Sequence, residues 1–274
     1  MKNNFKVSVI FGILITMAAV LYQRATGPTY PKKAYIGKSI NQEIQVKFLR
    51  SHGGETNAPI EIPKISKNMS GTFTYKRYPT KDEWHTIPLK DTGNLLSGEL
   101  PNQPPAGKLK YFINLNIDGN KEQIASADEP IMIRFKGDVP TYILAPHIFF
   151  MFLSMLLSAI CFMEAVFNTQ SFVKIGRATA ACLVIGGMIL GPIVQKFAFG
   201  VYWAGFPFDW DLTDNKLLIG VLAWTFGVLM TLKKAKRWPI IFASIVLFGV
   251  YCIPHSMMGS EYNYEKGEVQ TDVD

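Results

Sequence analysis

A short stretch between two apolar segments concentrates side chains that suit ligand binding. Aromatic rings can hold a flat apolar ligand, whereas aspartate oxygens are the ligands that Ca²⁺ and Mg²⁺ prefer. A use without any ligand also exists, because Trp and Tyr gather at the headgroup level of membranes. The stretch, residues 197–215, therefore predicts either a ligand platform or an interfacial belt. Its rings and carboxylates are Phe197, Phe199, Tyr202, Trp203, Phe206, Phe208, Trp210, Asp209, Asp211 and Asp214.

Two histidines lie at the ends of apolar segments. His147 and His255 each follow a proline, and Met151 comes four residues after His147. Imidazole and thioether groups are axial ligands of haem iron and ligands of copper. The alternative is that each histidine is an ordinary polar residue that bonds to the backbone at the membrane boundary. We predict that the two histidines share one site beneath the aromatic stretch, with that alternative left open.

The three aspartates also allow two interpretations. Asp209, Asp211 and Asp214 are predicted to form a divalent-cation site if their oxygens converge. Asp214 and Asn215 also precede the next apolar segment, predicted to begin at residue 216, where a side-chain oxygen would cap the first turn of a helix.

Residues 199–224 resemble the WWD-motif haem-handling membrane proteins of cytochrome c assembly. Phe199-Gly-Val-Tyr202-Trp203 stands where that family has WGxxW, and Trp210-Asp211 stands where it has the terminal WD. The pattern departs in its first aromatic, which is Phe199, and in the six residues between Trp203 and Trp210, where the family has one. The resemblance implies haem held non-covalently at the outer face of the membrane. In terms of this resemblance, the haem contacts would be Phe199, Tyr202, Trp203, Trp210 and the flanking His147 and His255.

Apolar segments must position these residues. The chain has 274 residues, 49% of them hydrophobic, and the apolar residues concentrate at the N-terminus and in the second half. Segments of nearly 20 apolar residues are long enough to cross the hydrocarbon core. Five transmembrane helices are predicted, over 7–22, 142–167, 177–196, 216–232 and 238–254.

Basic residues orient the predicted helices. Lys2 and Lys6, Lys174 and Arg177, and the run 233–237 all fall on one side, which the positive-inside rule places in the cytoplasm. Because these clusters include the most concentrated basic run, the net charge of +7 does not indicate nucleic acid. The first segment is predicted to be an uncleaved signal anchor, since no small-x-small cleavage site follows it. The opposite side is therefore the exported one.

The polar region between the first two apolar segments alternates as β-strands do. The run 43–49 places Ile44, Val46 and Phe48 on one face, and turn signals such as Asp118-Gly119 separate similar runs. About seven short strands in this length predict an immunoglobulin-like sandwich. Residues 75–119 resemble exported fibronectin or immunoglobulin-like modules, a resemblance that implies a fold and no activity. No cysteine lies in this region to form a disulfide.

The predicted fold is an α-helical membrane protein with five transmembrane helices and an inserted all-β immunoglobulin-like sandwich domain. Its predicted place is the cytoplasmic (inner) membrane, crossed several times, with the sandwich and the C-terminal tail on the exported side. The predicted parts are a signal anchor (1–23), an exported β-sandwich (24–140), a four-helix transmembrane domain (141–256) with its outer aromatic loop (197–215), and an acidic exported tail (257–274).

Two functions of different class remain open. One is an envelope membrane protein that holds haem or a divalent cation at its outer face and serves cofactor handling or electron-transfer assembly. The other is a non-enzymatic, membrane-anchored binding or scaffolding protein whose sandwich contacts an envelope partner, either protein or glycan. Residues 24–140 contain no nucleophile elbow, HExxH motif or glycine-rich phosphate loop. Whether the chain is an enzyme is not decided by its sequence.

Overall fold

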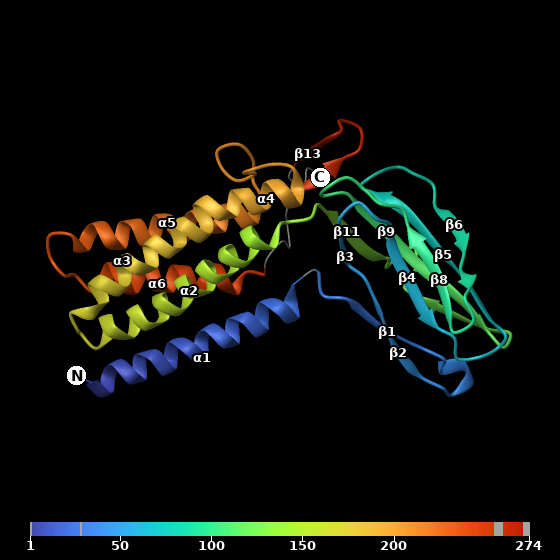
Figure 1. Ribbon diagram of the computed structural model, residues 1–274, viewed down its shortest axis with the longest axis horizontal. Helices are drawn as coiled ribbons and strands as arrows, with labels where there is room; N and C mark the ends of the chain where they lie inside the picture. Colours follow the sequence, from blue (N-terminus) through green and yellow to red (C-terminus); the bar gives the residue numbers. More distant parts are fainter. Residues whose placement is uncertain (1, 28, 255–259, 271–274) are drawn as a thin grey trace. The chain divides into compact units, whose positions relative to one another are not determined.

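The fold is known from a computed structural model, which describes residues 2–27, 29–254 and 260–270 (Figure 1). The described chain divides into two compact units. A helical unit contains the N-terminal segment and residues 139–254, and a β unit contains residues 29–138 and 260–270. The protein thus has an apolar helical part and a β domain.

The helical unit is built from apolar helices. Within the described chain, four helices are long and apolar enough to cross a membrane, as in a multi-pass membrane protein. The last predicted segment forms a shorter apolar helix of 15 residues. The helices are α1 (Lys2–Thr26), α2 (Thr141–Val166), α3 (Ser171–Leu183), α4 (Gly191–Phe199), α5 (Leu212–Thr231) and α6 (Trp238–Cys252).

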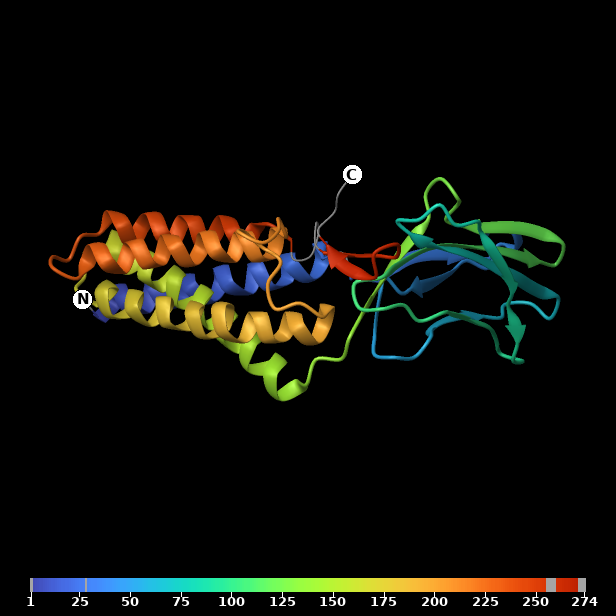
Figure 2. The ribbon, with the colours of Figure 1, turned by 90° about the horizontal axis from the view of Figure 1, so that it is seen from above.

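The third long helix contains a π-helical segment, η2 (Val184–Leu190), between α3 and α4. The backbone N–H of Gly191 bonds to the carbonyl of Gly186, five residues back, as π-helical geometry requires. Glycine permits a close approach here, because a Cβ on Gly186 would lie 2.8 Å from Cβ of Phe150 in α2. Figures 1 and 2 show α2, α3, α5 and α6 lying side by side, in agreement with their contacts.

A buried carboxylate joins α1 to the other helices. Glu164, near the end of α2, is 1% exposed. Its Oε1 accepts a hydrogen bond from Ser8 Oγ of α1 at 2.6 Å, and its Oε2 accepts from Thr169 Oγ1 at 2.6 Å and from Ser171 Oγ. Because an unpaired buried carboxylate is costly, these three hydroxyls stabilise the ionised group and tie α1 to the turn between α2 and α3.

The β unit contains a six-stranded sheet ordered β3-β11-β9-β5-β6, with β10 also paired to β9, a three-stranded sheet ordered β4-β8-β7, and a ribbon of β1 and β2. The strand β3 runs parallel to β11, so the large sheet is mixed. The strands are β1 (Lys32–Ile36), β2 (Ile44–Phe48), β3 (Ser51–Gly53), β4 (Ala58–Pro63), β5 (Met69–Tyr78), β6 (His85–Pro88), β7 (Lys90–Asp91), β8 (Leu95–Leu100), β9 (Lys108–Ile117), β10 (Asn120–Ile124) and β11 (Ile131–Lys136).

The core of the β unit follows from alternation. Every second residue of β9 is buried, from Leu109 to Ile117, and the residues between them face outward. The small sheet packs against this apolar face, since a Cβ on Gly98 of β8 would lie only 2.6 Å from the ring of Phe73 in β5. The predicted turn at Asp118-Gly119 is confirmed: both residues have positive φ, 52° and 89°, and they join β9 to β10.

The C-terminal tail contributes a hairpin to the β unit. Within the predicted tail 257–274, residues 260–270 form β12 (Glu261–Asn263) and β13 (Glu268–Gln270), and the remaining positions lie outside the described residues. Lys108 of β9 forms an ion pair with Glu261. The hydroxyl of Tyr264 lies 3.0 Å from Gln103 Oε1 and 3.2 Å from the carbonyl oxygen of Lys108. Burial raises the pKa of Tyr264 to about 12, so this hydroxyl stays protonated at neutral pH.

Candidate functional site

The aromatic loop is shorter than predicted. Helix α4 extends to Phe199 and α5 begins at Leu212, four residues before the predicted start at residue 216, so the loop comprises residues 200–211. The early start has a local cause. The Oδ1 of Asp211 accepts hydrogen bonds from the backbone N–H groups of Thr213 (2.7 Å) and Asp214 (3.2 Å). The helix cap expected at Asp214 or Asn215 is therefore Asp211.

Asp214 and Asn215 hold the loop against the first turn of α5. The Oδ2 of Asp214 accepts a hydrogen bond from the N–H of Ala204 at 2.7 Å, and Oδ1 of Asn215 accepts one from the N–H of Phe206 at 2.7 Å. The backbone passes so close that a Cβ on Gly205 would lie 2.7 Å from Cβ of Asp214. These two side chains thus shape the loop.

The predicted cation site is not formed by the described residues. Asp209 accepts a hydrogen bond from the N–H of Trp210 at 2.8 Å, and Asp211 and Asp214 bind backbone N–H groups as described above. Among the residues that the structure describes, no group of three or more His, Cys, Asp or Glu side chains could hold a metal ion.

Most aromatic side chains of the loop are exposed on the surface of the helical unit. Phe208 is 81% exposed and Trp210 is 72% exposed, and Tyr202 and Phe206 are exposed as well. Trp203 is half-buried and its Nε1–H donates to the carbonyl oxygen of Phe206 at 3.1 Å. Phe199, at the end of α4, is half-buried. Exposed rings at the end of an apolar helix favour the interfacial alternative over a closed ligand platform.

His147 bonds to the irregular part of the third long helix. Its Nδ1 lies 2.8 Å from the carbonyl oxygen of Gly186 in η2. Since a carbonyl only accepts, Nδ1 carries the proton, and Nε2 of the neutral ring keeps its lone pair. Met151, one turn further along α2, packs against the buried core of the helical unit. His255 lies outside the described residues, so the predicted shared site of the two histidines stays a prediction.

Lys216 is a buried ionisable residue that was not predicted from the sequence. It is buried in the second turn of α5, and its Nζ donates to the carbonyl oxygens of Ile253 (2.9 Å) and Pro254 (3.4 Å) at the end of α6. A lysine near a helix N-terminus opposes the helix dipole, which is the sequence signal that could have singled it out. Its role is to satisfy the two carbonyls that directly follow α6.

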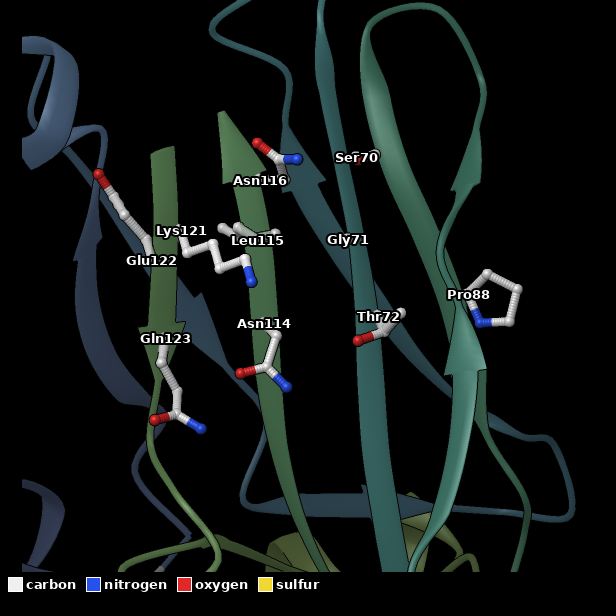
Figure 3. A pocket seen from close by; sticks show the side chains of 10 residues that line it. All are labelled: Ser70, Gly71, Thr72, Pro88, Asn114, Leu115, Asn116, Lys121, Glu122 and Gln123. Atoms are coloured by element: carbon white, nitrogen blue, oxygen red, sulfur yellow. The ribbon is translucent and has the colours of Figure 1, made fainter. Parts of the chain in front are cut away.

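A second candidate site lies on the outer face of the six-stranded sheet. This face has an open hollow of about 740 Å³ across β10, β9, β5 and β6. Figure 3 shows the amides of Asn114, Asn116 and Gln123, the ammonium of Lys121, the hydroxyl of Thr72 and the carboxylate of Glu122, which come from β9, β10 and β5. The polar groups alternate with the buried residues of the same strands, which is why they all face away from the core. The lining includes Thr72, Pro88, Asn114, Asn116, Lys121 and Gln123.

We predict that Asp211 acts as a helix cap and not as a metal ligand. Replacing Asp211→Ala removes the oxygen that binds two N–H groups, so the thermal midpoint of the detergent-solubilised protein falls, by an amount equivalent to about 1 kcal/mol. Asp211→Asn keeps an oxygen at this position and serves as the control, with a smaller loss. A metal site would behave differently: the midpoint of the unaltered protein would fall on adding EDTA and recover with Ca²⁺ or Mg²⁺.

Comparisons of the chain with family models, with curated proteins and with solved structures find no match. The function must therefore be inferred from the geometry of the chain itself.

Proposed function

We propose that the chain is a non-enzymatic, membrane-anchored binding protein whose β domain contacts an envelope partner. The observation that carries this proposal is the polar hollow on the outer face of the six-stranded sheet. The strands β5, β9 and β10 place hydroxyl, amide and ammonium groups there, which suit the recognition of a partner with hydrogen-bonding groups. The carboxylates of the aromatic loop, by contrast, are occupied by backbone donors.

The membrane topology that we propose has five crossings. The β unit lies between α1 and α2 in the sequence, and the C-terminal hairpin belongs to the same unit. A chain that leaves this unit and returns to it must cross the membrane an even number of times in between. The three long helical segments after the β unit (α2, α3 to α4, and α5) make an odd number, so the short helix α6 must supply the fourth crossing.

The length of α6 is compatible with that role. Its 15 residues span ~22 Å at a rise of 1.5 Å each, against a hydrocarbon core of ~30 Å, so its flanking residues and local thinning of the bilayer must cover the difference. The basic residues at 233–237 then lie in the cytoplasm, and the β unit lies outside the cytoplasmic membrane. In this arrangement the β unit is an exported module of the immunoglobulin-like kind, and the exposed loop rings sit in the membrane interface.

The first prediction tests this topology. After the native cysteines Cys161, Cys182 and Cys252 are replaced by Ser, single cysteines at Asn120 and Glu265 should both react with a membrane-impermeant maleimide added outside the cell. Both positions belong to the β unit, which is why they must share a side. A cysteine at Lys234 is the control and should react only after the membrane is opened. Labelling of Asn120 and Glu265 from opposite sides would refute the five-crossing arrangement.

The second prediction tests the binding role. A photo-crosslinking residue (p-benzoylphenylalanine) at Asn116 or Gln123, in the hollow, should form adducts of higher mass in living cells. The matched control is Gln45, which is also exposed on a strand but lies on the β1–β2 ribbon. Adducts at Gln45 that equal those at Asn116, or no adduct at any of the three positions, would contradict a partner site in the hollow.

One observation supports a second candidate function, haem binding at the outer face. The Nδ1–H of His147 is fixed by the carbonyl of Gly186, and this is how metal-ligating histidines are commonly oriented, with Nε2 toward the metal. His147 fits the role of one axial ligand. The aromatic loop fits less well, since its most exposed rings do not enclose a common space.

Visible absorption of the purified protein tests this candidate. If His147 is an axial ligand, added haem gives a Soret band, and His147→Ala shifts or removes that band without changing the helical content. Met163, on the same helix, provides the control variant Met163→Ala, which should leave the spectrum unchanged. The haem candidate is excluded if the unaltered protein binds no haem, or if His147→Ala binds it with the same spectrum.

A further inference from the structure

Two lysines lie directly opposite each other at the centre of the β unit. Lys76 on β5 and Lys110 on β9 are register partners, and both face away from the core. Lys76 lies over the ring of Trp84, with Nζ 5.0 Å from its centroid, and Lys110 lies 3.8 Å from the ring centroid of Tyr78. Within the described residues, neither ammonium takes part in an ion pair. Like charges placed directly opposite on neighbouring strands destabilise a sheet.

Burial lowers the pKa of Lys110, and the Lys76 ammonium lowers it further, whereas Glu261 raises it. The two positive charges therefore oppose each other in a partly desolvated position. The adjacent lysine on the same face, Lys108, differs because Glu261 neutralises it. Among the described lysines of β5 and β9, Lys76 and Lys110 are therefore the two that form no salt bridge.

Protection of a sheet edge does not explain the pair. A second opposed pair, Lys33 and Lys47, lies on the two-stranded β1–β2 ribbon, where lysines on exposed strands discourage pairing with another chain. The strands β5 and β9 are interior strands of the large sheet. A like-charge pair at the interior of a sheet has no such protective use.

The lysine pair lies on the same face of the large sheet as the hollow. Lys110 is four residues from Asn114 along β9, or ~13 Å at the rise of a strand. Between them Phe112 packs edge-on against Trp84, with ring centroids 5.2 Å apart. Beyond Asn114 lie the amide of Gln123 and the ammonium of Lys121, which Figure 3 shows on the neighbouring strand. One face therefore offers cations, an aromatic pair and amides in a row.

We propose that this row of side chains binds an anionic glycan, an extended polysaccharide with carboxylate or phosphate groups. The inference rests on the proposed binding function and names its ligand. Lys76 and Lys110 meet the anionic groups, the half-exposed indole of Trp84 lies against a sugar ring, and the amides of Asn114 and Gln123 bond to hydroxyl groups. An acidic protein segment fits less well, because protein interfaces depend on desolvated apolar anchors in enclosed pockets, and the hollow is open.

Calorimetric titration of the full-length protein in uncharged lipid nanodiscs tests the proposal. The probe is a hexameric oligogalacturonate, and the matched probe is the same hexamer with every carboxylate methyl-esterified. We expect the anionic hexamer to bind at least ~10-fold more tightly than its ester, since hydrogen bonds to charged groups are stronger than those to neutral groups. The double variant Lys76→Gln/Lys110→Gln should lower the affinity for the anionic hexamer by at least ~10-fold, and Trp84→Ala should lower it for both hexamers.

The second opposed pair supplies the control variant. Lys33→Gln/Lys47→Gln removes the same charge and should leave the affinity unchanged within about twofold. Removing Lys76 and Lys110 relieves repulsion but also removes their contacts with Trp84 and Tyr78, so the thermal midpoint of the test variant is measured beside the titration to show that the variant is folded. Equal losses in both double variants would overturn the proposal by showing unspecific attraction. It is overturned as well if hexaglutamate binds as tightly as the anionic hexamer, or if inorganic phosphate at equal charge concentration displaces it.

Photo-crosslinking and titration together distinguish a failure of the proposed binding function from a failure of the glycan assignment. If adducts form at Asn116 and Gln123 but neither hexamer binds, the partner site stands and the glycan assignment is wrong. If neither adducts nor hexamer binding are found, both the binding function and the glycan assignment are wrong.

Discussion

The ion pair between Lys108 and Glu261 joins the C-terminal hairpin to the central strand of the β unit. Arg134 donates to the carbonyl of Ser260, and Tyr264 bonds to Gln103, so the last described residues are held by three separate strands or loops of that unit. Through these contacts residues 260–270 belong to the unit that the chain left after residue 138. The number of helices that cross the membrane, and hence the role of the short helix α6, depends on these contacts.

Ionisable residues of the helical unit are mainly structural. An ionisable group at membrane depth is a functional candidate by default. Here Asp211 caps α5, Lys216 satisfies carbonyls that directly follow α6, and Glu164 binds hydroxyls from α1 and from the α2–α3 turn. Each group is satisfied by protein donors or acceptors at the end of a helix, where backbone groups have no partner within the helix itself. His147 differs, because its bond to Gly186 uses only one of its two ring nitrogens.

In the β unit, the two faces of strand β9 carry different kinds of side chain. The inward residues of β9 build an apolar core with Phe73 and the small sheet, whereas its outward residues change along the strand from lysines through Phe112 to asparagines. On this face the opposed ammonium groups of Lys76 and Lys110 destabilise the sheet unless a bound anion balances their charge. The hollow and the lysine pair lie on the same face of the large sheet, and the proposed binding function and the proposed ligand depend on the same row of residues.

Local sequence determined the elements of this protein. Hydropathy over long apolar runs predicts the helices, and period-two alternation predicts strands such as β2 and β9, because both properties depend on neighbouring residues alone. The turn at Asp118-Gly119 follows from the tolerance of these residues for positive φ. Helix α5 begins four residues earlier than predicted, because Asp211 caps it in place of Asp214. The sequence offers both aspartates as caps, and the choice depends on the path of the loop, which passes close to Asp214 at Gly205. Strand pairing was decided by tertiary structure: the parallel contact of β3 with β11, the opposition of Lys76 and Lys110, and the return of the tail to β9 join residues far apart in the chain. The energy of such contacts arises from register and shared burial, which no local pattern of residues encodes.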